Sequence, residues 1–128
     1  YRTEIACSHI DTDTHYVLMR VTGTASGTIP IIYKTTDNFT NLTYIPAPAD
    51  ADTGIPDEDF TRGQSYYDLE IEVDPTNNDI IYVGGIDWFR SQNGGSSWSQ
   101  ITKWSNNNNL AAPSGEAFAR GGFRQRKS

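Results

Sequence analysis

A polar turn rich in glycine follows the apolar run of residues 80–83 and constrains the fold more than any other feature of the chain. It reads Arg90-Ser91-Gln92-Asn93-Gly94-Gly95-Ser96-Ser97-Trp98. Asn93 can hydrogen-bond its own downstream backbone, and Gly94 and Gly95 reach positive φ without steric cost. Trp98 opens the next segment with a large apolar surface and one N–H that needs an acceptor. The stretch therefore predicts a tight turn between two short strands.

A degenerate copy of this turn occurs 56 residues earlier in the chain. Aligning Thr35 with Ser91 places Asp37 on Asn93 and Leu42 on Trp98. Upstream, residues 10–17 parallel residues 73–81, with the first copy one residue shorter. Self-similarity at a period of about 50 residues is typical of stacked repeat units. We therefore read the chain as two copies of one unit.

Each copy contains four segments with the composition and alternation of β-strands. Leu69, Ile71 and Val73 alternate with acids, which predicts one buried and one solvent-facing side for that strand. We predict an all-β fold of two four-stranded antiparallel sheets. The expected strands are residues 3–7, 15–21, 29–34 and 43–46, then 67–73, 79–84, 86–91 and 98–104.

The chain divides by composition into four parts. Residues 1–46 form the degenerate copy, 47–65 an acidic loop between the copies, 66–104 the clearer copy, and 105–128 a polar and basic tail. The tail is a linker, a basic arm or a vector-derived end. The net charge of −6 argues against nonspecific nucleic-acid binding, because phosphates repel an acidic surface. No apolar run approaches the roughly 20 residues of a membrane span.

The pattern Ser-x-Asn-x-Gly-x-x-Trp at residues 91–98 resembles the Asp-box, or BNR repeat, of sialidases, sortilin-type receptors and xyloglucanase-like glycosidases. Asn93 stands where the usual residue is Asp. The similarity covers roughly residues 3–104 and is strongest over 66–104. The resemblance implies a structural turn between the third and fourth strands of a β-propeller blade. The turn residues that it implies are Ser91, Asn93, Gly95 and Trp98, with Thr35 and Asp37 in the first copy.

Two blades do not close a propeller, which has about 4–8. The resemblance thus implies either a piece of a longer protein or a chain completed by homo-oligomerisation. It also implies a secreted or cell-surface bacterial protein. From these features we predict a noncatalytic binding or structural module whose ligand is carbohydrate or protein, with no nucleic-acid partner.

The alternative is an enzyme, a fragment of a glycoside hydrolase that uses paired carboxylates as acid and as nucleophile or base. The candidate carboxylates are Asp57 and Asp59 in the acidic loop and Asp68 and Glu70 on the strand that follows. Clustered oxygens also suit Ca²⁺. The Asp-x-Asp-x-Asp-Gly calcium loop is absent from the sequence, so we predict no metal site and expect no cofactor, with Ca²⁺ as the open alternative.

Aromatic side chains are the remaining ligand-binding candidates, because aromatic faces stack on sugar rings. We assign Tyr66, Trp88 and Trp104 to this role, and Trp98 and Phe89 to core packing. Cys7 is the single cysteine. With His9 it lacks an orienting third group, so we read it as a small buried thiol beside a turn histidine.

Overall fold

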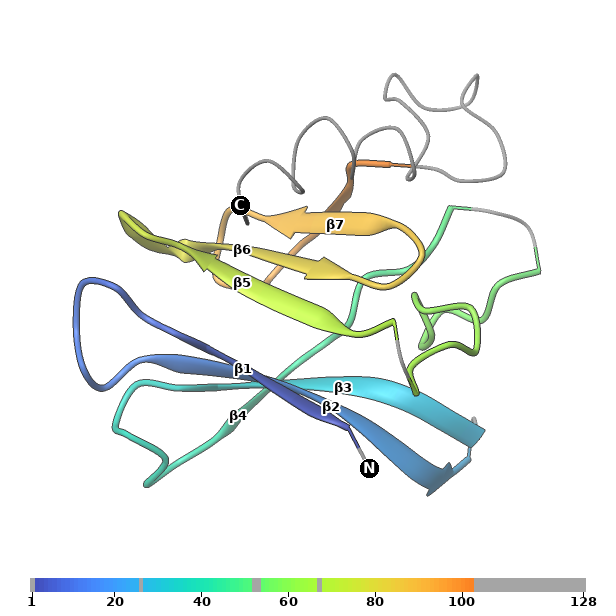
Figure 1. The fold of residues 1–128 in the computed structure, drawn as a ribbon, viewed down its shortest axis with the longest axis horizontal. Coiled ribbons are helices and arrows are strands. Elements are labelled where there is room, and N and C mark those ends of the chain that lie inside the picture. The colour runs from blue at the N-terminus through green and yellow to red at the C-terminus, as the bar shows by residue number, and fades with distance from the viewer. Residues whose placement is uncertain (1, 26, 52–53, 67, 103–128) are drawn as a thin grey trace.

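Two four-stranded antiparallel sheets make up the fold in the computed structural model, which describes residues 2–25, 27–51, 54–66 and 68–102 (Figure 1). The first sheet contains, in order, β1 (Thr3–Cys7), β2 (His15–Thr24), β3 (Gly27–Thr35) and β4 (Thr43–Ile45). The second contains β5 (Glu70–Asp74), β6 (Asn77–Gly84), β7 (Trp88–Ser91) and β8 (Ser99–Gln100). The expected all-β class and both sheets are confirmed. Within the described ranges no helix is long and apolar enough to cross a bilayer.

Several strand ends differ from the sequence-based expectation. β2 and β3 extend toward each other as far as Thr24 and Gly27, and Gly23 at φ 76° lies within the extended β2. β5 begins at Glu70, because the chain before it turns and the Asp68 N–H donates to the Gln64 carbonyl. β8 begins only after Trp98, which is part of the turn. The structure does not describe residues 67, 103 and 104, which were expected in strands, or the tail 105–128.

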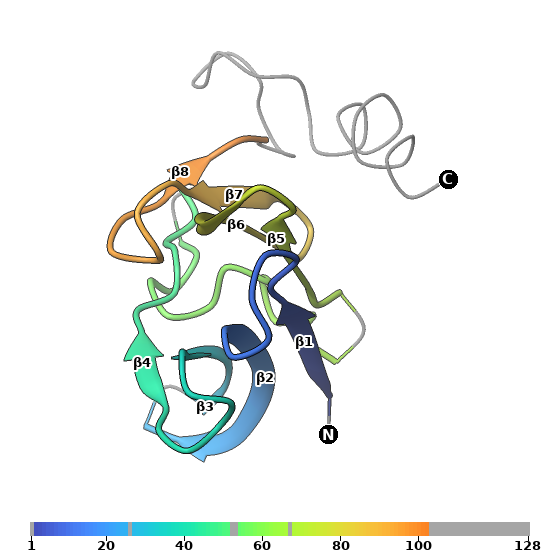
Figure 2. The same cartoon turned by 90° about the vertical axis from the view of Figure 1, so that its left-hand side faces the viewer.

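A single apolar core lies between the two sheets, which pack face to face (Figures 1 and 2). The predicted alternation of the fifth strand is confirmed, since Leu69, Ile71 and Val73 are buried. Phe60 from the inter-sheet loop adds an aromatic contact, with its ring centroid 5.6 Å from that of Phe89 in an edge-on arrangement. The core comprises Ala6, Tyr16, Leu18, Ile32, Ile45, Phe60, Leu69, Ile71, Val73, Ile81, Val83 and Phe89.

The pairing registers give the correspondence between the two sheets. His15 lies opposite Thr35 in the first sheet, and Ile81 lies opposite Ser91 in the second. His15 therefore corresponds to Ile81. The expected alignment of residues 10–17 with 73–81, which paired Val17 with Ile81, was wrong by two residues, because it matched a local apolar pattern without the strand pairing.

The sheets pack head to tail, with unlike faces in contact. The first sheet buries the face that carries Tyr16, Leu18 and Ile32. The second sheet meets it with the face that carries Ile81, Val83 and Phe89. By the registers, this second face corresponds to the outer face of the first sheet. A symmetric sandwich would instead bring equivalent faces together.

The two turns predicted from the repeat have the same hydrogen-bond pattern. In the β3–β4 turn, the buried Thr35 hydroxyl accepts the Phe39 N–H at 2.9 Å and donates to Asp37 at 2.9 Å. In the β7–β8 turn, Ser91 accepts the Gly95 N–H at 2.8 Å and donates to Asn93 at 2.9 Å. The Asp37 and Asn93 side chains then each accept a backbone N–H four residues on.

The Asn for Asp difference between the turns is compensated by the residue four positions later. Asp37 Oδ2 accepts a hydrogen bond from the side-chain amide of Asn41 at 2.8 Å. Asn93 instead donates its own amide to the Ser97 hydroxyl at 2.8 Å. The first residue of this side-chain pair is thus the acceptor in the β3–β4 turn and the donor in the β7–β8 turn, and the backbone hydrogen bonds of the two turns remain the same.

Gly95 brings the second turn into close contact with the first sheet. Its φ is 93°, and a Cβ at this position would lie 2.4 Å from Ile45 Cγ2. Real Cβ atoms do not approach a neighbour so closely, so only glycine allows this packing. Trp98 fixes the same turn from its other end, because its indole N–H donates to the Pro46 carbonyl at 2.9 Å and its ring packs on the core. The assignment of Trp98 and Phe89 to packing is confirmed.

We expect Gly95→Ala to lower the free energy of unfolding by about 2–5 kcal/mol, because it adds left-handed backbone strain to overpacking against Ile45. Chemical denaturation followed by tryptophan fluorescence would measure the change. Gly23→Ala is the matched control: its φ is 76° but a Cβ there meets no atom within 4 Å, so it should cost only the backbone strain of about 1–2 kcal/mol. Equal losses in the two variants would show that contact with Ile45 is not a constraint.

Candidate ligand-binding groove

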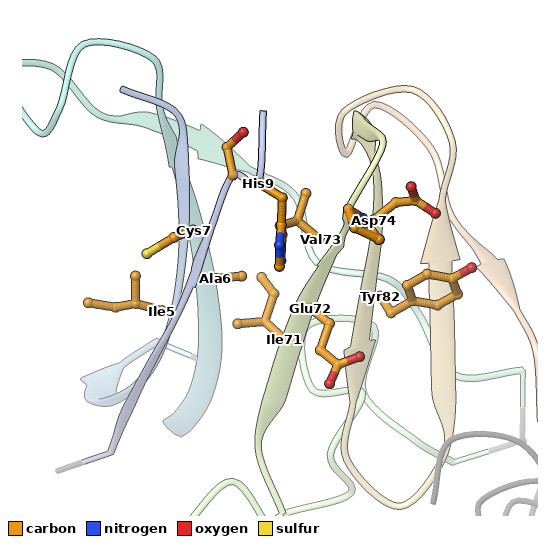
Figure 3. Close-up of a pocket in the computed structure, with 11 residues that line it drawn as sticks. Ile5, Ala6, Cys7, His9, Ile71, Glu72, Val73, Asp74 and Tyr82 are labelled. Atoms are coloured by element: carbon orange, nitrogen blue, oxygen red, sulfur yellow. The ribbon is translucent and has the colours of Figure 1, made fainter. Parts of the chain in front are cut away.

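A groove of about 680 Å³ runs between β1 and β5, the neighbouring edge strands of the two sheets (Figure 3). Its volume falls within the range of small-molecule sites, roughly 300–1,000 Å³. An edge strand carries, on one side, backbone N–H and C=O groups that its own sheet does not use. The groove therefore offers backbone hydrogen-bonding groups along both walls. It is lined by Ile5, Ala6, Cys7, Ser8, His9, Ile71, Glu72, Val73, Asp74, Pro75 and Tyr82.

Side chains from the two walls differ in direction. The His9 imidazole lies in the gap between the strands, beside Ala6 and Val73 (Figure 3). Cys7 points away from β5 and is exposed, which contradicts the expectation of a buried thiol. Glu72 and Tyr82 share a face of the second sheet that points away from the first. The gap between the strands thus holds Ala6, Ile71, Val73 and the His9 imidazole, and the carboxylates of Glu72 and Asp74 also belong to the groove lining.

A polar seam joins the two sheets at the β1–β2 and β5–β6 turns, next to the groove. Asn78 accepts a hydrogen bond from Ser8 at 2.7 Å and donates one to Asp11 at 2.7 Å. Asp11 also accepts the N–H groups of Asp13 and Thr14. These backbone bonds lower the pKa of the Asp11 carboxyl below its ordinary value. The Ser8 and Asp11 side chains are therefore committed to structure.

Tyr16 extends this seam into the core. Its ring is fully buried, and its hydroxyl donates to the Asn78 carbonyl at 2.6 Å. The Lys34 ammonium lies 5.5 Å from the ring centroid and 4.0 Å from the Asp79 carboxylate. Burial, reinforced by the negative charge of Asp79, raises the pKa of Tyr16 to about 12. Tyr16 thus remains neutral across the physiological range.

The four candidate catalytic carboxylates have different surroundings. Asp59 is buried and accepts the backbone N–H groups of Thr61 and Gly63, at 3.0 and 2.8 Å, so it holds a turn. Asp57 is exposed in the same loop. Glu70 begins β5 and is half-buried. Asp68 is half-buried, and burial raises the pKa of its carboxyl while the positive charge of Arg2 opposes that shift.

Arg62 forms the centre of a buried ion cluster that the sequence did not reveal. Its guanidinium contacts both oxygens of Asp50 at 3.2 and 3.3 Å and lies 3.7 Å from Asp87. Asp87 in turn accepts a hydrogen bond from Thr102 at 3.0 Å. The cluster ties the inter-sheet loop to the second sheet. Over the described ranges, no group of three or more histidine, cysteine or acidic side chains is arranged to hold a metal ion.

The aromatic candidates do not form one surface. Tyr66 is exposed, whereas Trp88 is buried and its ring lies against Gly84. Trp104 lies outside the described residues. Sequence reasoning missed the apolar groove wall and the role of Asn78, because neither has a local signal. Both depend on which strands the fold brings together.

No protein-family model, curated protein or solved structure matches this chain. The assignment of function consequently rests on the residues and their geometry.

We expect Tyr16→Phe to lower the free energy of unfolding by about 1 kcal/mol at neutral pH, because the Asn78 carbonyl loses its donor. The folded-state pKa of Tyr16, about 12, is above the ordinary value of 10.0. The favourable contribution of the neutral phenol is therefore complete below pH 10 and is lost as pH rises toward 12. The difference between wild type and Tyr16→Phe should narrow over that interval in urea titrations. Tyr44→Phe, at an exposed ring, should leave the pH profile unchanged.

Replacing Arg62 by Met should destabilise the fold by about 3–5 kcal/mol, because the Asp50 and Asp87 carboxylates stay buried without their shared cation. Arg2→Met is the control: its ion pair with Glu4 is partly exposed, at 34% and 38% side-chain accessibility, and it donates one hydrogen bond to the Leu69 carbonyl at 3.3 Å, so the loss should be about 1–2 kcal/mol. Thermal and urea unfolding of both variants would measure the difference. Similar losses would argue against a specific role for the cluster.

Proposed function

We propose that this chain is a noncatalytic binding module of a secreted or cell-surface bacterial protein, with its ligand held in the groove between β1 and β5. The observation that carries the proposal is the groove itself, which lies between two strand edges and has both apolar and polar side chains in its lining. Edge strands bind extended chains through backbone hydrogen bonds, and an apolar floor adds affinity. A linear ligand, either a peptide segment or an oligosaccharide, suits this shape.

The proposal includes the architecture of the module. We infer that the two sheets are consecutive blades of an Asp-box β-propeller, as the resemblance of residues 91–98 implies. Two features support this inference: the matching hydrogen bonds of the two turns, and the head-to-tail packing of the sheets. A head-to-tail interface forms rings when its rotation closes. The secreted or cell-surface bacterial location rests on the resemblance alone.

The surroundings of the candidate carboxylates support binding over hydrolysis. Glycoside hydrolysis needs two carboxyl groups facing one bond across about 5–10 Å. Asp59 already accepts two backbone N–H groups, and Asp57 is exposed to solvent. The raised pKa of Asp68 is the one observation that favours the alternative, a glycoside hydrolase fragment, because a catalytic acid needs such a shift. No cofactor takes part in the proposed binding.

Backbone amide NMR of the full chain provides the test. Xyloglucan and cello-oligosaccharides would be titrated alongside a library of extended peptides. We expect chemical-shift changes along β1 and β5, and weaker binding in His9→Glu, which places a carboxylate at the groove. Leu42→Glu, which places the same carboxylate at an exposed side chain outside the groove lining, is the matched control and should bind as wild type does.

Shift changes confined to other surfaces would argue against the groove. An assay for newly released reducing ends should be negative with every oligosaccharide. Hydrolysis that Asp68→Asn abolishes would replace the binding proposal with the enzyme alternative.

A further inference from the structure

The outer face of the first sheet is built like the buried face of the second. Ile5, Val17 and Tyr33 are aligned across its strands, and they correspond by register to Ile71, Val83 and Phe89. Ile71 is 6% exposed and Phe89 1%, whereas on the outer face Ile5 is 55% exposed, Tyr33 is half-buried and Val17 is 8% exposed. The outer face of the first sheet therefore has the composition of a face that packs on another sheet, as the buried face of the second sheet packs on the first.

The two faces differ in the turn beside them. Phe39 in the β3–β4 turn takes the place of Gly95 in the β7–β8 turn, with the same hydrogen bond to the turn hydroxyl. Both residues have positive φ, 70° and 93°. The ring of Phe39 stacks on His15, at 4.9 Å between centroids and 9° between planes. His15 lies on the outer face, so the ring is held at that face.

The Gly95 contact shows what Phe39 would meet. At Gly95 even a Cβ would come within 2.4 Å of Ile45 on the adjoining sheet. A sheet packed in the same way on the outer face would place its own equivalent of Ile45 against Phe39. In a second copy of this chain, the residue equivalent to Ile45 is Ile101. Ile45 pairs with Ile32, and the Ile101 N–H bonds to the carbonyl of Trp88, which corresponds by register to Ile32. The two large side chains cannot occupy this space together.

We propose that Phe39 selects the partner of the outer face. It excludes a second copy of this chain and accepts a β-sheet that has glycine or alanine at the position of Ile45. Such a small residue leaves room for the aromatic ring, which then fills the space between the sheets. The inference rests on the head-to-tail packing of the two sheets and is independent of a ligand in the β1–β5 groove.

The test compares the solution mass of full-chain variants by size exclusion with light scattering across a concentration series. Wild type should keep the 14.2 kDa mass of one chain. Phe39→Gly and Ile101→Gly relieve the same clash from opposite sides, so each should show a mass that rises with concentration. Leu42→Gly removes a similarly exposed side chain from the Phe39 turn and Ile101→Leu keeps the clash, so both controls should retain the mass of one chain.

Adding Ile5→Lys to either associating variant should restore the single-chain mass, because it places a charge on the outer face. A wild type that associates, and that Ile5→Lys dissociates, would overturn the proposal, since the face would then accept a second copy despite Phe39. Folded Phe39→Gly and Ile101→Gly variants that both keep the single-chain mass would overturn it as well. Circular dichroism would verify that each variant is folded, and neither readout depends on ligand binding.

Discussion

The rest of the structure depends on the close contact between the Gly95 turn and Ile45 of the first sheet. This contact sets the distance between the sheets, because no side chain can stand at residue 95. With the sheets at that distance, the apolar faces of β2 and β3 and of β5 to β7 form one core. The Trp98 indole then reaches the Pro46 carbonyl and fixes the turn. The absence of a side chain at residue 95 thus lets the second turn lie directly against the first sheet.

Polar groups at the margins of the core prevent the sheets from sliding. Asn78 bridges Ser8 and Asp11 of the first sheet's turn, and its carbonyl accepts the Tyr16 hydroxyl. On the second sheet, Arg62 ties the inter-sheet loop to Asp87. Hydrophobic burial is non-directional, so it favours contact without specifying orientation. Directional hydrogen bonds and a buried ion cluster supply that specificity.

Head-to-tail packing also connects the fold to the proposed function. It leaves β1 and β5 as neighbouring edges, so a groove opens where the two sheets meet. It leaves the outer face of the first sheet available to a further sheet, subject to Phe39. The ligand surface and the assembly surface meet at Ile5, which lines the groove and also lies on the outer face. In the proposed propeller, the groove would bind the ligand and the outer face would contact the next module.

The sequence by itself determined the all-β class, the two four-strand copies and the paired turns, because alternation and turn residues act over a few neighbouring positions. It placed Ser91, Asn93, Gly95 and Trp98 in one turn, and β5 with one buried side. The tertiary structure alone decided the correspondence of His15 with Ile81, the buried pair of Asp50 and Arg62, and the exposure of Cys7. These features depend on which strand faces lie together, and burial and hydrogen-bond partners between distant segments have no local signal in the chain.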